Sequence, residues 1–296
     1  LMRLKLLIAY VGTCYSGWQI QEKPSPPPTV QGEMEKALRT ITGQNIRAHG
    51  SGRTDSGVHA HGQVVHCDVP DARANMDWRR SLNAVLPRDI RVLEAMQAAP
   101  DFHARKDALR KTYAYQFWLE QTFMPPQLTP FVWKCGPMNI EAMRAALPHL
   151  TGLHDFAALR NVGTDVESTE RTVLQTELHA MPPCEFYPPH APMLRFIVTA
   201  DGFLKQMVRN MAGLLAACGQ GKVLPKDIPA LLATRDRRDV PSVTAPPQGL
   251  ALVNVVCACI AMDNEDYLRE TRCGVENAFE TIFAATQNSI SELDIE

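Results

Sequence analysis

The N-terminal third of the chain alternates between two hydrophobic periods, one typical of strands and one typical of helices. Apolar side chains at nearly every second position predict a strand from Leu4 to Tyr10 and another from Gln63 to Val69. Between them, an apolar stripe at helical spacing begins after Thr29, a good N-cap, and stops at Gly43. The stripe consists of Val30, Met34, Ala37, Leu38 and Ile41. The pattern therefore predicts a strand, a helix and a strand in succession.

A second round of strands and helices follows in the C-terminal part of the chain. Strands are expected at Thr112–Trp118, Arg171–His179, Leu194–Ala200 and Leu250–Cys257, and helices at Ile140–Leu150 and Phe203–Cys218. Two such rounds in one chain predict an α/β (α+β) fold of two mixed domains. We place the boundary at residue 106, in a stretch where neither pattern holds, which gives domains at 1–106 and 107–262.

The remaining residues look peripheral to these two domains. The proline-rich piece from Met181 to Pro192 interrupts the pattern, and residues 263–296 form an acidic C-terminal extension. Within this extension, the spacing of apolar residues predicts a short amphipathic helix at Val275–Phe283. The extension holds nine acidic and two basic residues, a net charge of −7. Because the whole chain has a net charge of −2, residues 1–262 carry a net charge of +5. A basic body is compatible with binding to nucleic acid, although such a charge is also ordinary for its length.

Composition narrows the class of protein. With 296 residues and 45% hydrophobic content, the chain is able to bury a large core. No apolar run approaches the roughly 20 residues that a membrane helix needs, and the N-terminus lacks a signal-peptide pattern. The eight cysteines form no C-x-x-C pair, which favours reduced, buried thiols. We therefore expect a cytoplasmic protein without a membrane partner.

The segment from Ser51 to His59, with the sequence Ser-Gly-Arg-Thr-Asp-Ser-Gly-Val-His, carries the main candidate for chemistry. Its glycines permit backbone angles that other residues resist, and a predicted strand follows it, so Asp55 is expected on a rigid loop. An aspartate in such a string is by itself more often a turn former. Arg53, two residues earlier, and the distant Arg209 are candidate partners for a carboxylate or a phosphate. A paired Asp55 would be able to act as a nucleophile or a base.

Two further segments place basic residues next to apolar ones. In Arg110-Lys111-Thr112-Tyr113-Ala114-Tyr115, both tyrosines fall on one face of a strand directly after a basic pair, an arrangement suited to stacking a base. The alternative is a core stripe, and we expect Tyr115 and Phe117 to be core. Arg209 falls off the apolar stripe of its predicted helix, on the same face as Lys205, where a solvated basic edge is the simpler interpretation.

Metal and cofactor sites are poorly supported. His59-Ala60-His61 places two histidines on one face of a strand, but further ligands at a recognisable spacing are missing from the sequence. A structural role for both histidines is therefore favoured. The chain also has no phosphate-binding loop and no dinucleotide fingerprint, so we expect neither a metal nor a cofactor.

Taken in order, the motifs resemble those of the TruA family of tRNA pseudouridine synthases over nearly the whole body. The matching segments are Tyr10-Val11-Gly12-Thr13, Gly17-Trp18-Gln19, Thr29-Val30-Gln31, Gly52-Arg53-Thr54-Asp55, Gly57-Val58-His59, Leu82–Pro87, Phe102-His103-Ala104-Arg105, Lys111-Thr112-Tyr113, Gly152–Phe156, Met207-Val208-Arg209-Asn210 and Ala245–Leu250. The chain departs from the family pattern at Val11, at His61, in the 181–192 insertion and in the acidic tail. None of these departures removes a residue that the resemblance makes catalytic.

The resemblance implies a role for each candidate residue. Asp55 would be the catalytic aspartate, Tyr113 would stack on the target base and assist proton transfer, and Arg209 would pair with Asp55. Arg53 would insert near the flipped nucleotide or hold its phosphate, and Leu250 would help to wall the pocket. Attack of the aspartate on the sugar and attack on the uracil ring are both compatible with the sequence.

The same resemblance implies the reaction and its setting. The family isomerises uridine to pseudouridine without a cofactor, on the 3′ side of the tRNA anticodon stem-loop, here expected at positions 38–40 of the tRNA. Its fold places two α/β domains, each an antiparallel sheet with helices on one face, around a central basic cleft. Its bacterial members are homodimers. We therefore expect tRNA and a second copy of the chain as partners.

Two other functions compete with this interpretation. A catalytically silent RNA-binding protein on the same scaffold would share the basic surface, but it has no need for a carboxylate, which repels phosphate. The joint presence of Asp55, Tyr113 and Arg209 therefore favours the enzyme. A metal-dependent hydrolase built on His59 and His61 is a more distant third.

Overall fold

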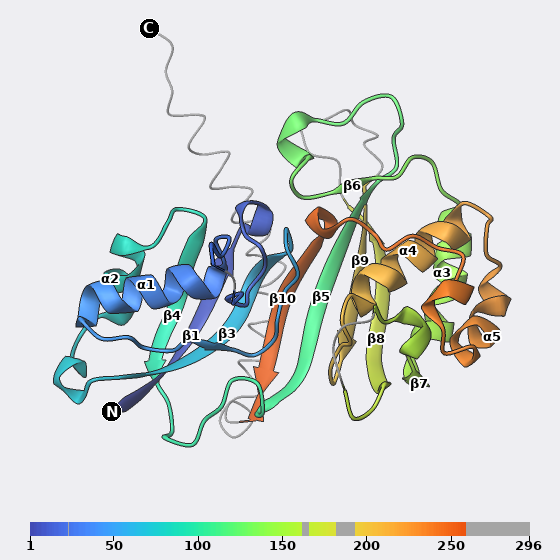
Figure 1. The fold of residues 1–296 in the computed structure, drawn as a ribbon. Helices are drawn as coiled ribbons and strands as arrows, with labels where there is room; N and C mark the ends of the chain where they lie inside the picture. The colour runs from blue at the N-terminus through green and yellow to red at the C-terminus, as the bar shows by residue number, and fades with distance from the viewer. Residues whose placement is uncertain (23, 162–165, 182–192, 259–296) are drawn as a thin grey trace, which may run out of the picture. The chain divides into compact units, whose positions relative to one another are not determined.

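The fold rests on one large mixed β-sheet with helices packed against it (Figure 1). The computed structural model describes residues 1–22, 24–161, 166–181 and 193–258. Residues Leu1–Val256 form one compact unit, and Cys257–Glu296 form a second, of which only the first two residues are described. The acidic extension and its expected helix, together with residues 182–192 of the insertion, therefore lie outside the described residues.

The described elements follow the expected alternation of strands and helices. The N-terminal half contains β1 (Met2–Tyr10), α1 (Val30–Thr42), β2 (His49–Gly50), β3 (His59–Val69), α2 (Trp78–Val85) and β4 (Ile90–Gln97). The C-terminal half contains β5 (Ala108–Trp118), β6 (Trp133–Lys134), α3 (Ile140–Ala146), β7 (Gly152–Asp155), β8 (Glu170–Ala180), β9 (Met193–Ala200), α4 (Met207–Gly219), α5 (Ile228–Ala233) and β10 (Leu250–Cys257).

The last described strand joins the two halves of the sheet. The main path of the sheet has the order β4-β1-β3-β10-β5-β9-β8-β7, so β10 lies between the two halves. It runs parallel to β3, with Ala251 opposite His59, whereas β1 with β3 and β5 with β9 are antiparallel. The mixed α/β class is confirmed. The division at residue 106 and a basic cleft between two domains stay predictions.

Local sequence explains α1 well. The hydroxyl of Thr29 accepts a hydrogen bond from the Gly32 N–H at 3.2 Å, and Gly43 ends the helix in the left-handed conformation with φ 75°. The face that includes Val30 and Met34 is buried against the sheet. Here the apolar stripe and both caps indicate the same element, so the prediction is confirmed to within a residue.

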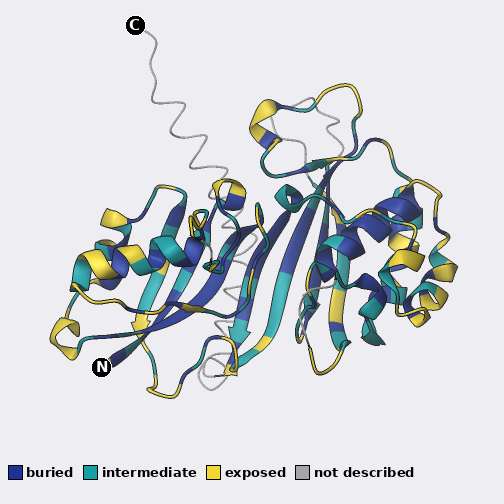
Figure 2. Cartoon of the chain, in the orientation of Figure 1, coloured by how far each residue is buried: buried dark blue, intermediate teal, exposed yellow. Residues whose placement is uncertain are grey.

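Burial along the strands matches the expected core (Figure 2). Tyr115 and Phe117 on β5 are both fully buried, as predicted. Two helices differ from expectation. The segment expected as a helix at Ile140–Leu150 is α-helical only to Ala146 and continues as a 3₁₀ turn, because Pro148 has no N–H to donate to the preceding turn.

The helix expected at Phe203–Cys218 begins four residues later, at Met207, so its predicted start was wrong. Gln206 has φ 60°, a left-handed conformation that breaks the helical path. Lys205 therefore lies before the helix and shares no helical face with Arg209. The predicted basic edge formed by these two residues was wrong as well.

Among the described residues, no helix is both long enough and apolar enough to cross a membrane.

One glycine sets how closely α4 approaches the chain that precedes β10. A Cβ built on Gly213 would lie 1.8 Å from the carbonyl oxygen of Val243, which is backbone and is unable to move aside as a side chain would. Only glycine therefore allows α4 to contact residues 243–245. Arg209, one helical turn earlier, reaches the same segment.

We expect Gly213→Ala to lower the free energy of unfolding by about 2–3 kcal/mol, despite the better helix propensity of alanine, because helix and backbone must separate. Urea denaturation measures the loss. Gly202→Ala is a suitable control, because its new Cβ would lie 3.4 Å from the flexible side chain of Arg171. A Gly213→Ala protein as stable as the control would contradict this account of the contact.

Candidate functional site

Asp55 lies at the first position of a tight turn. The Val58 N–H donates to the Asp55 carbonyl oxygen at 3.1 Å, and Gly57 has φ 79°, which together describe a type II turn. The Gly57 N–H also donates to the carbonyl oxygen of Tyr15 at 3.2 Å. The turn therefore has one stable shape, and it presents a carboxylate whose side chain remains 30% exposed.

The residue before Asp55 is fixed from two sides. The Thr54 hydroxyl shares a hydrogen bond of 2.8 Å with the Tyr10 hydroxyl, at the end of β1. The Trp18 N–H donates to the Thr54 carbonyl oxygen at 3.1 Å. Burial raises the pKa of Tyr10, so its hydroxyl stays protonated and remains able to donate.

A buried polar chain holds the start of the same loop. The Ser51 hydroxyl donates to the side-chain oxygen of Gln63 at 2.5 Å, and the Gln63 amide donates to the Gly52 carbonyl oxygen at 2.8 Å. From β5, the Lys111 ammonium donates to the Ser51 carbonyl oxygen at 2.7 Å. Because these groups are buried or half-buried and paired, the loop is held against both β3 and β5.

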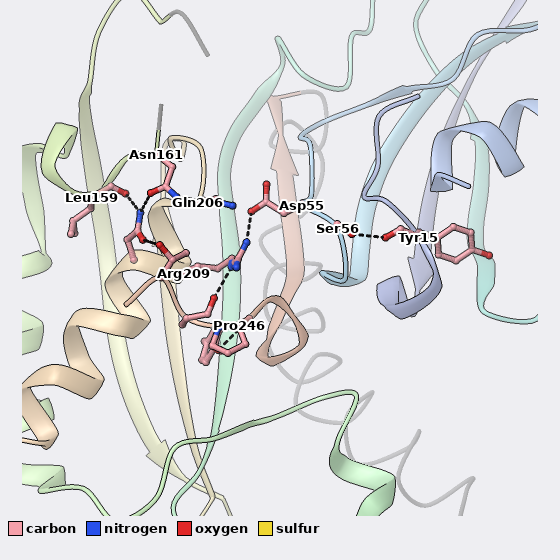
Figure 3. Close-up of polar contacts among 12 residues, drawn as sticks. Tyr15, Asp55, Ser56, Leu159, Asn161, Gln206, Arg209 and Pro246 are labelled. Atoms are coloured by element: carbon pink, nitrogen blue, oxygen red, sulfur yellow. Dashed lines mark hydrogen bonds and ion pairs between the residues drawn. The ribbon is translucent and has the colours of Figure 1, made fainter. Parts of the chain in front are cut away.

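The loop meets α4 through one ion pair (Figure 3). Arg209 Nη1 lies 3.2 Å from Asp55 Oδ2, and the Arg209 side chain is only 12% exposed. Arg209 Nε donates to the carbonyl oxygen of Ala245 at 2.7 Å, and the Ala245 N–H donates back to the Arg209 carbonyl oxygen at 3.1 Å. The guanidinium is thus oriented before any substrate binds. Asp55 Oδ1 makes no hydrogen bond to the described residues, which leaves it available for a reaction.

Asn210 fixes the start of α4 and with it Arg209. Its amide donates to the carbonyl oxygen of Leu159 at 2.8 Å and to Asn161 Oδ1 at 3.0 Å, and its oxygen accepts from the Thr244 hydroxyl at 2.7 Å. The Asn210 side chain is fully buried. It therefore ties the helix to two loops, one of which leads to Ala245.

Tyr113 lies beside this ion pair on β5. It is 7% exposed, and its ring packs edge-on against Phe203 with centroids 5.1 Å apart. Burial, followed by the nearby Tyr10 and Asp55, raises the pKa of the Tyr113 hydroxyl. Tyr113 thus lies within electrostatic range of the Asp55 carboxylate, two residues along β5 from Lys111, which contacts the Asp55 loop. Two residues further along β5, the Tyr115 hydroxyl donates to the Pro246 carbonyl oxygen at 2.8 Å. This bond holds the loop before β10, which also accepts the hydrogen bond from Arg209.

The two remaining candidate residues, Leu250 and Arg53, differ in burial and in their contacts. Leu250 is buried at the start of β10, next to the strand position at which Ala251 pairs with His59. Arg53 is exposed and forms no ion pair with Asp55 or with any other described residue. The structure thus brings Asp55 and Arg209 together, with Tyr113 and Leu250 on nearby strands, and the guanidinium of Arg53 has no partner in the described part of the chain.

The two histidines after the loop do not resemble a metal site. His59 Nδ1 accepts a hydrogen bond from the Gly12 N–H at 3.0 Å, and its Nε2 lies 2.8 Å from the Pro130 carbonyl oxygen. Both ring nitrogens are thus engaged, and burial lowers the pKa of His59, which favours the neutral ring. Within the described ranges, no three or more His, Cys, Asp and Glu side chains are grouped to hold a metal ion.

Sequence reasoning did not single out the supporting residues. Tyr10, Gln63 and Asn210 appear in the sequence as polar or half-polar positions inside apolar segments. A polar residue buried in such a segment must find a partner, and this is the signal that could have identified them. The sequence does not say which partner it finds.

Comparison with known proteins gives a consistent result. A family model described as tRNA pseudouridine synthase matches residues 6–106 and 146–256. A protein named tRNA pseudouridine synthase A from Oleidesulfovibrio alaskensis is 51% identical, covering 86% of this chain and 95% of its own. A protein of the same name from Nitratidesulfovibrio vulgaris (strain Miyazaki F) is 47% identical and covers 86% of this chain and 99% of its own length. Another, from Geobacillus kaustophilus, is 41% identical and covers 86% of this chain and 93% of its own length.

We expect Asn210→Ala to lower the free energy of unfolding by about 3 kcal/mol, because it leaves the buried carbonyl oxygen of Leu159 and the half-buried hydroxyl of Thr244 unpaired. Urea denaturation again provides the measurement.

The matched control is Asn83→Ala. Asn83 bridges to the Val92 backbone through both amide atoms, at 2.8 Å each, but its side chain is half-exposed, so water is able to replace it. We expect this control to cost about 1 kcal/mol. Equal costs at the two positions would mean that Asn210 does not hold the site together through buried bonds.

Proposed function

The chain belongs to the tRNA pseudouridine synthase family, and from this we propose that it isomerises uridine to pseudouridine in tRNA with Asp55 as the catalytic group. It is thus an isomerase that acts on tRNA. The observation that carries the assignment of Asp55 is its ion pair with Arg209, on a turn that keeps the carboxylate both rigid and partly exposed.

The reaction conserves every atom of the nucleoside apart from proton exchange. The N-glycosidic bond from C1′ to N1 breaks, the uracil turns, and a new bond forms from C1′ to C5. The proton on C5 leaves to solvent or to a base, and N1 gains a proton. Asp55, paired with Arg209, would supply the nucleophile: its attack on C1′ or on the uracil ring forms a covalent bond to the enzyme, and this bond breaks again once C1′ is joined to C5.

The neighbouring residues would hold the flipped nucleotide. The Tyr113 ring is positioned beside Asp55 and offers a surface for stacking the uracil, which offsets part of the cost of removing a base from its stack. Its hydroxyl, which stays protonated, would assist proton transfer. Leu250 would close the pocket from β10. Arg53, whose guanidinium pairs with none of the described residues, would insert near the flipped nucleotide or hold its phosphate.

The setting of the reaction follows from the family resemblance. We propose that the target uridines lie at positions 38–40, on the 3′ side of the anticodon stem-loop, that two copies of the chain work together as a homodimer, and that the enzyme acts in the cytoplasm. Sequencing of modified positions in a treated tRNA transcript is expected to find pseudouridine at these positions. Modification confined to another arm of the tRNA would contradict the assignment.

The catalytic proposal is tested by release of tritium from C5 of labelled uracil in a tRNA transcript, with no metal or nucleotide added. We expect the wild-type protein to release tritium, and Asp55→Asn to release no more than a protein-free blank. The substitution keeps the shape of the side chain but removes the nucleophile. Binding of tRNA, measured by filter retention, is expected to change by less than about twofold, since the carboxylate itself repels phosphate.

Asp227→Asn provides the control, because Asp227 is exposed and its side chain caps no helix N–H. Retained turnover in Asp55→Asn would sink the mechanism. Tight binding of tRNA by the wild-type protein without any tritium release would instead favour the catalytically silent RNA-binding protein.

A further inference from the structure

Lys5 has a largely buried side chain, and its ammonium has no counter-ion among the described residues. It lies on β1 directly opposite His66 of β3, and its side chain belongs to a residue that is only 7% exposed. Its ammonium lies 5.4 Å from the centre of the Phe102 ring and makes no hydrogen bond or ion pair to the described residues. The Lys5 nitrogen is not among the fully buried side-chain atoms that lack a partner, so the ammonium is accessible to a ligand although most of the side chain is buried. The cation–π contact with Phe102 compensates its charge only in part.

Three histidines gather beside Lys5, each from a different segment. His49 comes from β2, His66 from β3, and His103 from the connection between β4 and β5. The His49 and His66 rings stack at 4.8 Å with an interplanar angle of 16°, and His103 lies 4.6 Å from His66 and 6.1 Å from His49. His66 is buried in the middle, while His49 is exposed and His103 is half-buried.

Backbone contacts decide which ring nitrogens remain available. His66 Nδ1 accepts from the Ala104 N–H at 3.1 Å, and His103 Nδ1 accepts from the Arg105 N–H at 3.2 Å. In the neutral rings the proton therefore lies on Nε2, which is a hydrogen-bond donor. The ring of His49 makes no hydrogen bond to the described residues. The cluster thus offers donors rather than acceptors.

The charges around the cluster are unevenly paired. Three carboxylates are engaged: Asp68 by Arg3 at 2.8 Å, Glu35 by Arg47 at 3.4 Å, and Asp107 by the His103 N–H at 2.8 Å. The exposed Asp101 acts on Arg3 at longer range. In contrast, the side chains of Lys5, Arg105 and Lys106 have no carboxylate partner among the described residues. The pKa of His66 is lowered to about 4, first by burial and then by its neighbours, so the His66 ring adds no charge at neutral pH.

We propose that Lys5, His49 and His103 bind a phosphate group in the backbone of the RNA substrate, with Arg105 and Lys106 at the rim. Lys5 supplies the positive charge, the outer histidines supply donors, and His66 supports both of their rings. The site lies seven residues along β3 from His59, roughly 23 Å from the end at which Asp55 is presented. β2 leads from His49 directly into the Asp55 loop, so RNA held here is aligned with the catalytic site.

The assignment of the ligand rests on the proposed function, which supplies RNA as substrate. The geometry itself identifies an oxyanion of the phosphate class, which also includes free phosphate.

The test compares Lys5→Met with Lys36→Met in the full chain. Both substitutions remove one ammonium and keep most of the apolar stem, but Lys36 is exposed on α1. We measure the Kd for an unmodified tRNA transcript over a series of KCl concentrations. For Lys5→Met we expect affinity to fall about tenfold and the slope of log K against log salt to decrease by about one, as for one lost phosphate contact. A Kd and a slope equal to those of Lys36→Met would overturn the proposal.

A second readout separates binding from a structural role. Because the Lys5 ammonium makes no hydrogen bond or ion pair to the described residues, we expect Lys5→Met to leave the Tm of the RNA-free protein nearly unchanged. A lower Tm together with an unchanged Kd would show that Lys5 serves only the fold. His49→Ala, at an exposed ring without hydrogen bonds, is the second variant, and we expect it to weaken tRNA binding about threefold. Wild-type affinity in this variant would also contradict the proposal.

Inorganic phosphate distinguishes the two sources of the ligand. We titrate phosphate into the wild-type protein and Lys5→Met and follow the imidazole C–H resonances by NMR. Weak binding that disappears in Lys5→Met, together with the loss of tRNA affinity, supports the RNA site. Tight binding of free phosphate together with unchanged tRNA affinity in Lys5→Met would assign the site to a small phosphate ligand instead. These binding measurements do not depend on turnover. A wild-type protein that releases no tritium would therefore contradict the catalytic proposal, while the phosphate site would still be decided by the Kd values and their salt dependence.

Discussion

The arrangement of the site depends on one ion pair between residues that are far apart in the chain. Asp55 and Arg209 are separated by 154 positions and lie 3.2 Å apart. Ion pairs in which both side chains are exposed contribute little stability, because water competes for both charges. Here the arginine is nearly buried and is fixed by a second bond to Ala245, so the pair acts mainly to set geometry. The pair therefore sets the position of the carboxylate relative to α4, while the surrounding contacts keep each partner in place.

Each partner is supported by its own set of buried polar contacts. On one side, Thr54 and Ser51 connect the Asp55 turn to β1 and β3, and Lys111 connects it to β5. On the other side, Asn210 connects α4 to two loops. Because nearly every group in these networks has a partner, rearranging either support would break several buried hydrogen bonds at once. A site of this kind is preorganised, which lowers the cost of reaching a reactive geometry.

Prediction from sequence succeeded where the signal was local. The stripe and caps of α1, the core face of β5 and the strand after the Asp55 loop follow from periodicity and residue type. The start of α4 was missed, because the left-handed Gln206 leaves no mark in the hydrophobic pattern. Pairing of β10 with β3 and the contacts of Asn210 were also missed, since both join distant parts of the chain. Motif order supplied the candidate site residues, and only the coordinates supplied their distances.

The position of β10 affects the order in which this protein is able to form during synthesis. β3 and β5 both have an unpaired edge until residues 250–257 leave the ribosome, because β10 is the neighbour that separates them. Unpaired edges are sites at which unfinished chains associate with one another. The Asp55 loop therefore reaches its final surroundings only after most of the described chain has been made. Changes in translation rate near the codons for β10 are therefore expected to influence the yield of native protein more than similar changes near the start of the coding sequence.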